Sequence, residues 1–278
     1  EGLSPATALR AVFCPVSAQV PLLDIAYSPL HEKIDAAALA QLETYAGLLH
    51  TEAMPGGFIG DCTIEELYLR HILDSVLPAI APESSADFPL NNTSGLKVFD
   101  LGAGAGLPSL PLAILFPQHE FHLLDSQEKR CRFAESAAAA VGLKNVHVYH
   151  GVVQDFAQKY GKEKKADVVV FRAFRKILAS LELALHVLRE AAPPNGGEPL
   201  RAHPKVLYWR SQRVPFSDEG NTRVSDMGYQ IDSFVKFTSA EAILPRGLYT
   251  FSRVRTQKAA YPRSWKKISA DRLVEVES

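Results

Sequence analysis

The sequence is poor in cysteine, and the few that it has are scattered. Cys14, Cys62 and Cys131 are odd in number and far apart, and no C-x-x-C pair occurs. This pattern argues against a disulfide framework and against a cysteine-based zinc site. Reduced cysteines are typical of the cytoplasm, so we expect a cytoplasmic protein without a metal.

Net charge and long apolar runs are also lacking. The formal net charge is −1, so the chain as a whole lacks the basic excess of a nucleic-acid-binding protein, and any basic surface must be local. The uncharged stretch 11–23 has 13 residues and is interrupted by prolines, which makes it too short and too broken for a membrane span. We expect residues 1–30 to form an irregular arm, residues 31–96 a helical part, and residues 97–278 the main domain.

A glycine-rich stretch dominates what is present. Val98 and Phe99 lead into Asp100, glycines follow at positions 102, 104 and 106, and Pro108 opens an apolar run that extends through Phe116. This order predicts a buried strand, a tight turn and a helix with Pro108 in its first turn. Glycine suits such a turn because it tolerates positive φ and lets a ligand approach the backbone.

The spacing of the glycines and a second acidic residue point to the ligand. Dinucleotide-binding folds prefer G-x-G-x-x-G, whereas the G-x-G-x-G here resembles the S-adenosylmethionine (SAM) loop of Rossmann-like methyltransferases. The next predicted strand, 121–125, ends in Asp125, 23 residues after Gly102. A carboxylate at that strand tip can accept hydrogen bonds from the ribose hydroxyls of an adenosine, in NAD or in SAM.

The remaining pattern predicts an α/β fold with a mostly parallel sheet. Further strands are expected at 146–149, 166–171 and 206–209, and an antiparallel pair at 231–237 and 248–254. Helices are expected at 31–50, from Thr63 with capping-box spacing to Glu66, at 128–141 and at 178–188. The sequence therefore predicts a Rossmann-like SAM-dependent methyltransferase fold with N-terminal helices.

Four blocks, in order, resemble the GidB (RsmG) type of methyltransferase, which methylates N7 of a guanine in small-subunit ribosomal RNA. They are residues 70–75 (R-H-I-L-D-S), the loop 100–108, residues 124–130 (L-D-S-x-x-K-R) and residues 172–174 (R-A-F). The tail 261–263 (Y-P-R) also looks like the family's C-terminal motif. The resemblance implies SAM as cofactor and small-subunit ribosomal RNA, free or in the subunit, as partner, with no role for a membrane.

The chain departs from the family pattern near the third strand. The family usually has G-R-A-E there, and this chain has Gly151-Val152-Val153-Gln154. Gln154 offers an amide in place of a carboxylate, and an amide can still hydrogen-bond an adenine. Two alternatives therefore remain: a SAM enzyme acting on a protein or small molecule, and a non-catalytic RNA-binding relative.

Two groups of site residues are expected. The resemblance assigns cofactor contacts to Gly102, Leu107, Val153, Gln154 and Arg172. The loop and strand pattern adds Gly104, Gly106 and Asp125. Arg172 has two expected partners, the methionine carboxylate of the cofactor or an RNA phosphate. Asp100 is expected to order the loop or to meet the methionine amine. We expect no catalytic base.

RNA binding needs local positive charge, and the C-terminal part supplies it. Residues 246–267 hold seven Lys or Arg and no Asp or Glu, with aromatic residues interleaved. Such a stretch favours phosphate binding and base stacking, although it also fits a solvated tail. The expected RNA-binding residues are Arg70, His71, Lys129, Arg130, Arg210 and Arg263.

Overall fold

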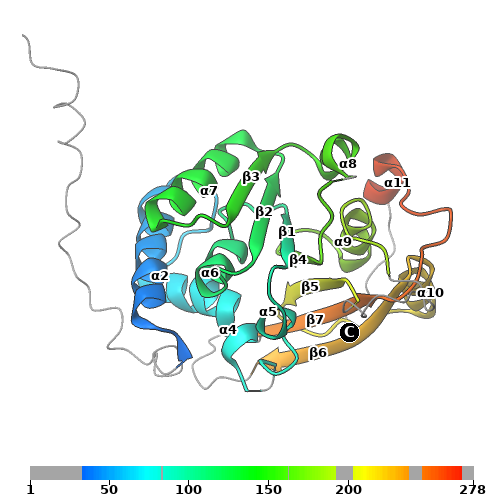
Figure 1. Cartoon of the computed structure of the whole chain (residues 1–278), viewed down its shortest axis with the longest axis horizontal. Coiled ribbons are helices and arrows are strands. Elements are labelled where there is room, and N and C mark those ends of the chain that lie inside the picture. Colours follow the sequence, from blue (N-terminus) through cyan, green and yellow to red (C-terminus); the bar gives the residue numbers. More distant parts are fainter. Residues whose placement is uncertain (1–32, 83, 162, 192–202, 238–245, 271–278) are drawn as a thin grey trace, which may run out of the picture.

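The computed structural model describes residues 33–82, 84–161, 163–191, 203–237 and 246–270. These residues form a three-layer α/β/α arrangement around one seven-stranded sheet of order β3-β2-β1-β4-β5-β7-β6 (Figure 1). The strands are β1 (Lys97–Leu101), β2 (Glu120–Asp125), β3 (Val146–His150), β4 (Val168–Arg172), β5 (Lys205–Arg210), β6 (Tyr229–Phe237) and β7 (Arg246–Arg253).

Strands β1 to β5 are parallel, and β7 pairs antiparallel with both β5 and β6. The predicted mostly parallel sheet and its antiparallel C-terminal pair are confirmed. Both faces of the central strands are covered, which explains their nearly continuous apolar sequences. In β1, Val98 belongs to the core on one face, and its neighbour Phe99 belongs to the core on the other.

Helices from the first part of the chain cover one face of the sheet. They are α2 (Ala36–Leu48), α3 (Ile64–Leu67), α4 (Asp74–Ile80), α6 (Ser109–Leu115) and α7 (Glu128–Val141), with a short α5 (Pro89–Asn92) before β1. Two π-helical turns, η2 (Leu49–Ala53) and η3 (Tyr68–Leu73), extend α2 and join α3 to α4. Thr63 and Glu66 form the predicted capping box at the start of α3. Pro108 precedes α6 as its N-cap, one position earlier than predicted.

Helices from the second part of the chain cover the other face. They are α8 (Val153–Tyr160), α9 (Ile177–Ala184), α10 (Asp218–Asp226) and α11 (Trp265–Ser269). The prediction that α9 runs to residue 188 was wrong. The backbone of residues 187–189 instead pairs with Ala166, which donates to the carbonyl of Val187 and accepts from the N–H of Arg189. That pairing draws the chain out of the helix four residues early.

The irregular arm expected at residues 1–30 lies outside the described residues. The division at residues 96 and 97 stays a prediction; side chains from both sides of it, such as Tyr45 and Val98, share one core. No helix in the described part of the chain combines the length and hydrophobicity that crossing a bilayer requires.

Candidate functional site

The predicted glycine turn follows β1 directly, and all three of its glycines have positive φ. The values are +85° at Gly102, +57° at Gly104 and +91° at Gly106, a region that L-residues rarely adopt. A Cβ on Gly102 would lie 2.2 Å from the ring of Phe174, whereas a Cβ on Gly104 would meet no heavy atom within 4 Å. The turn is therefore closed by protein at Gly102 and open at Gly104.

Two buried carboxylates hold the turn in shape. Asp125 accepts one hydrogen bond from the N–H of Gly104 (2.9 Å) and another from the N–H of Gln127 (2.8 Å). Asp100 accepts from the hydroxyl of Ser109 at 2.7 Å. The pKa of Asp100 is raised to about 7, mainly by burial; the Ser109 hydrogen bond opposes this shift, and the nearby charge of Asp125 adds to it. Through the hydrogen bond from Ser109, Asp100 joins β1 to α6, in line with its expected role of ordering the loop.

A cavity of about 630 Å³ lies at the carboxyl ends of β1 to β4. It is lined by residues 101–102, 124–127, 151–155 and 173–175, together with Arg130, Leu183 and Trp265. The carboxyl edge of a parallel sheet is where open α/β folds bind their ligands. Val152, which lines the side of the cavity near α8, is 44% exposed.

The cavity brings together part of the expected cofactor set. Gly102, Asp125, Val153 and Gln154 line it. Gly104, Gly106, Leu107 and Arg172 are not among its lining residues. The first three of these belong to the turn that follows β1, and Arg172 makes contacts elsewhere.

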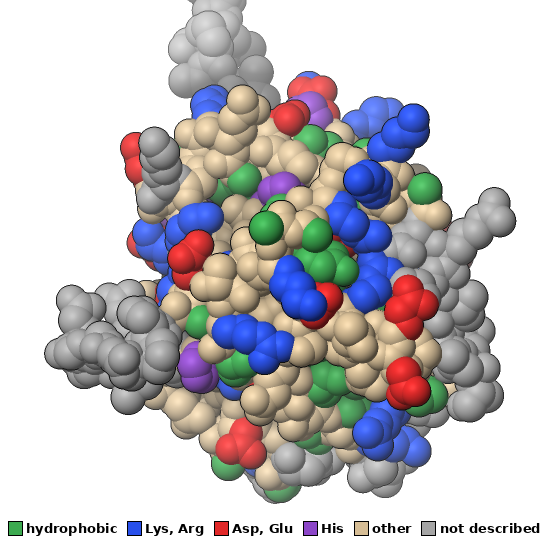
Figure 2. All heavy atoms as spheres, turned by 90° about the vertical axis from the view of Figure 1, so that its right-hand side faces the viewer, with side chains coloured by type: hydrophobic (Ala, Val, Ile, Leu, Met, Phe, Trp, Pro, Cys, Tyr) green, Lys and Arg blue, Asp and Glu red, His purple; other side chains and the backbone are tan. Residues whose placement is uncertain are grey.

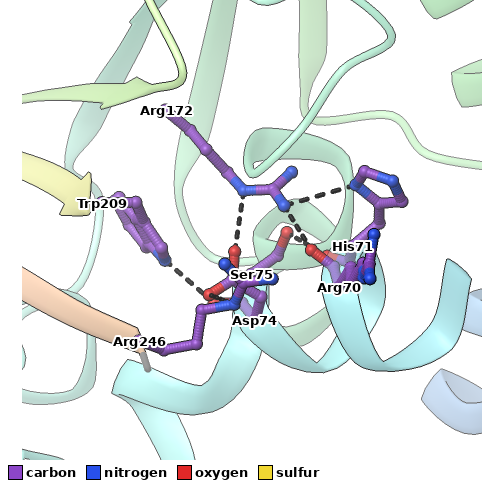
Figure 3. Close-up of polar contacts among 7 residues, drawn as sticks. All are labelled: Arg70, His71, Asp74, Ser75, Arg172, Trp209 and Arg246. Atoms are coloured by element: carbon purple, nitrogen blue, oxygen red, sulfur yellow. Dashed lines mark hydrogen bonds and ion pairs between the residues drawn. The ribbon is translucent and has the colours of Figure 1, made fainter. Parts of the chain in front are cut away.

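Arg172 is the centre of a polar network at the end of β4 (Figure 3). Its Nε donates to Oδ2 of Asp74 at 2.9 Å, and a terminal nitrogen donates to the carbonyl of Arg70 and lies 3.3 Å from Nδ1 of His71. The other oxygen of Asp74 lies 3.3 Å from Nε of Arg246. These contacts involve the R-H-I-L-D-S block of residues 70–75 directly.

A strand from the sheet completes this network from the other side. The indole of Trp209, on β5, donates to the carbonyl of Asp74 at 2.9 Å. Side chains from β4, β5 and β7 thus converge on one turn of helix. Burial and three neighbouring arginines lower the pKa of His71 to about 4, so His71 is neutral at pH 7. In this geometry the block fastens the N-terminal helices to the carboxyl edge of the sheet.

The expected RNA-binding residues do not form one cluster. Arg70 and His71 belong to the network around Arg172, and Arg70 also pairs with Glu66 at 2.9 Å. Lys129 is exposed on the first turn of α7, beside Arg130, which lines the cavity. Arg210 is the last residue of β5, opposite Gly247.

The basic C-terminal stretch is mostly engaged within the fold. The guanidinium of Arg263 donates to both carboxylate oxygens of the fully buried Glu182. Four more cations of the stretch each bind an acceptor in an adjoining helix or loop: Arg246, Arg253, Arg255 and Lys258. Lys266 and Lys267 are exposed on α11. The stretch is therefore largely a structural element. Its exposed cations are Arg255 and Lys258, which bind residues of α10, and Lys266 and Lys267 on α11.

Sequence reasoning did not assign several of the residues that line the cavity, among them three that come from the later part of the domain. Arg175 follows the R-A-F block, Leu183 lies on α9, and Trp265 opens α11. The signal for Trp265 was its position as an aromatic residue among cations. Arg175 and Leu183 had no comparable signal, because both are far from the glycine turn in the sequence. Only the fold places them at the cavity.

Comparisons with known proteins agree with this geometry. The family model GidB, described as rRNA small subunit methyltransferase G, matches residues 38–192. The ribosomal RNA small subunit methyltransferase G of Geobacillus kaustophilus is 31% identical over 232 residues, which cover 83% of this chain and 89% of that protein. The protein of the same name from Streptococcus pyogenes serotype M5 is 40% identical over 124 residues, covering 45% of this chain and 49% of that protein.

Among solved structures, Aeropyrum pernix fibrillarin in complex with natively bound S-adenosyl-L-methionine is 13% identical, with a TM-score of 0.42 over 64% of this chain and 72% of that one. The family model covers more than half of the 278 residues, and the Geobacillus protein aligns along most of both chains. The chain therefore belongs to the GidB family of rRNA small subunit methyltransferases G.

Proposed function

We propose that this protein transfers a methyl group from SAM to N7 of a guanine in small-subunit (16S) ribosomal RNA. The observation that carries the proposal is the cavity at the carboxyl edge of β1 to β4, which joins the glycine turn, Asp125 and the start of α8. Membership of the GidB family supports the reaction, and the names of the relatives support the substrate.

The residues of the cavity fit SAM. Each carboxylate oxygen of Asp125 accepts one backbone N–H and keeps acceptor capacity for a ribose hydroxyl. Val153 and Gln154 would border the adenine, and the open backbone at Gly104 gives the turn room for close approach. Nε of Arg130 is buried at the cavity wall and has no hydrogen-bond partner within the described residues, as expected of a group that awaits a ligand. When bound, SAM supplies the activated methyl group.

The chemistry asks the chain mainly for positioning. Guanine N7 carries an in-plane lone pair and no proton, so the transfer needs no general base. The rate advantage then comes from holding the base in line with the methyl group and from excluding competing geometries. His71 is neutral and is held in the Arg172 network, which agrees with a transfer that needs no general base.

The test is to map the new methyl group on ribosomal RNA. Wild-type protein, SAM and undermethylated small subunits, or free 16S RNA, are mixed, and the product is mapped by mass spectrometry. We expect one new 7-methylguanosine in 16S RNA. Methyl incorporation into ribosomal protein alone, or none with retained RNA binding, would favour the alternative functions.

A variant at the cavity connects the product to this site. Asp125→Ala removes the expected ribose acceptor and two backbone contacts. We expect SAM binding, measured by calorimetry, to weaken by roughly 1–3 kcal/mol, the usual cost of unpaired buried polar groups. Unchanged affinity would place the cofactor outside this cavity.

A further inference from the structure

Trp265 is an exposed aromatic side chain at the mouth of the cavity. It is 41% exposed, and Trp265 and Val152 are the two large hydrophobic residues that the described part of the chain leaves exposed. Both line this cavity. Globular proteins normally cover indole rings because they bury a large apolar area, so exposure at a ligand cavity indicates a binding role.

The helix that carries Trp265 is firmly attached to the fold. Ile268, one turn further along α11, is 2% exposed and belongs to the second core, the one on the face of the sheet that α8 to α11 cover. Just before the helix, Arg263 donates to Glu182 from its backbone N–H and from its guanidinium. The indole is therefore held in an exposed position by a well-anchored helix.

Flat side chains form a stack from the glycine turn to this indole. The ring of Phe174 packs against Gly102, the guanidinium of Arg175 lies 5.6 Å from the centre of that ring, and it lies 4.6 Å from the centre of the Trp265 ring. Arg175 covers one face of the indole, and the exposed fraction leaves surface on which another flat group can stack. Such a stack has the shape and polarisability that suit a nucleobase.

Positive charge surrounds the stack. Arg175 and Lys176 are exposed before α9, and Lys266 and Lys267 are exposed on α11. Figure 2 shows Lys and Arg side chains around hydrophobic ones on this face of the molecule. The acidic residues that line the cavity are Asp125, at the end of β2, and Asp155, on α8. SAM carries a sulfonium cation, so these lysines do not favour it, whereas they favour a polyanion.

We propose that Trp265, backed by Arg175, is the stacking platform for an unpaired RNA base at the mouth of the cavity, with Lys266 and Lys267 contacting the flanking phosphates. This rests on the proposed function, because it takes ribosomal RNA as the substrate. Unpaired RNA bases are commonly recognised by stacking on aromatic side chains and on Arg planes. Trp265 would then be a positioning residue for a methyl transfer whose rate depends on how the RNA is held.

The experiment compares Trp265→Leu with Trp265→Phe. Both replacements are apolar and suit a half-exposed site, but Phe alone keeps a ring. Binding to 16S RNA or small subunits is measured by filter titration at several salt concentrations, and methyl transfer is followed to separate KM from kcat. We expect Trp265→Leu to raise the Kd and the KM for RNA about tenfold, the effect of losing one stacked base, and Trp265→Phe to recover most of that loss. The salt slope stays at the wild-type value, because no charge is removed.

Two controls make the outcome specific. Val152→Ala trims the other exposed apolar side chain of the cavity without touching a ring, and it should leave RNA affinity near the wild-type value. SAM affinity, measured by calorimetry without RNA, should be unchanged in Trp265→Leu. Equal losses of SAM and RNA affinity would assign the stack to the adenine of the cofactor and overturn the proposal.

The remaining outcomes separate this proposal from the proposed function. Unchanged RNA affinity and KM in Trp265→Leu, with normal methylation of 16S RNA by the wild type, would overturn the platform alone. A wild type that places no methyl group on 16S RNA would overturn the proposed function, and with it the assignment of the platform to ribosomal RNA. Equal defects in Trp265→Leu and Trp265→Phe would also reject stacking.

Discussion

The glycines of the turn after β1 differ in what surrounds them, although all have positive φ. Gly104 faces open space, whereas a Cβ on Gly106 would lie 2.6 Å from Cδ1 of Leu110. A side chain at either position costs about 1–2 kcal/mol for the left-handed backbone alone. At Gly106 the side chain must also displace a core leucine, so the two positions separate backbone strain from packing.

This difference gives a paired prediction for Gly104→Ala and Gly106→Ala. We expect Gly106→Ala to lower the free energy of unfolding in urea clearly more than Gly104→Ala does. Gly104→Ala, and more so Gly104→Val, should mainly weaken SAM binding in calorimetry, because we expect the cofactor to approach the turn on the open side at Gly104. Full SAM affinity in Gly104→Val would show that the cofactor does not approach this part of the turn.

Asp100 makes stability depend on pH. Burial raises its pKa to about 7, so the folded protein binds more protons than the unfolded chain between about pH 4 and pH 7. The contribution of this group to the free energy of unfolding therefore falls as pH rises through that interval, by as much as about 4 kcal/mol at roughly 1.4 kcal/mol per pH unit.

Asp100→Asn tests this dependence, because the amide has a similar shape, stays neutral and can still accept from Ser109. In urea titrations we expect the variant to gain stability over the wild type at pH 8 and to differ little from it at pH 4. A constant difference between the two proteins across this range would contradict the assignment of the pH dependence to Asp100.

At the scale of elements, the network around Asp74 joins three strands to one helical turn. Asp74 is nearly buried and is shared by Arg172 and Arg246, and its carbonyl accepts from Trp209. A buried carboxylate with two cationic partners is costly to remove, because its loss leaves the partners' charges uncompensated.

We expect Asp74→Asn to lower the free energy of unfolding by about 3 kcal/mol, in the range for breaking a buried ion pair. The matched control is Glu66→Gln, which breaks the half-exposed pair with Arg70 and should cost less than about 1 kcal/mol. Urea unfolding of both variants measures the contrast. Similar small losses would mean that the network does not fasten the helices to the sheet.

The same network shows where prediction from sequence succeeds and where it ends. Local patterns place the strands, the glycine turn and α7, because apolar periodicity and turn residues act within a few positions. The partner of Arg172 is 98 residues away, and the partner of Arg263 is 81 residues away. Arg172 and Arg263 were therefore predicted to contact ligands, on motif and charge alone, whereas in the fold both hold carboxylates of their own chain.

At the scale of the whole molecule, charge is distributed very unevenly. The net charge is −1, yet exposed cations gather beside the cavity at α11 and the start of α9. Since Arg263 neutralises the buried Glu182, its removal would disturb the fold, and an RNA-binding test must leave it intact.

We expect Lys266→Ala combined with Lys267→Ala to weaken RNA binding and to reduce the slope of log K against log salt by about 2, which corresponds to two lost phosphate contacts. SAM affinity should not change. The control is Lys144→Ala, which removes an exposed cation just before β3. This residue lies at the amino ends of the strands, away from the cavity, and its loss should leave the slope as in the wild type. Filter binding at several salt concentrations measures all three proteins, and identical slopes would remove α11 from the RNA surface.

The strand order β5-β7-β6 also has a consequence for how the chain is made. Strand β6 pairs in the sheet with β7 alone, and β7 is the strand that covers the free edge of β5. During synthesis from the N-terminus, β5 therefore presents an open edge, and β6 has no partner in the sheet, until residue 253 has left the ribosome. The buried Glu182 gains its partner Arg263 later still, because Arg263 is synthesised after β7. The β5-β7-β6 side of the sheet is therefore the last to form. Until it forms, the open edge of β5 and the unpaired β6 can pair with the wrong strand.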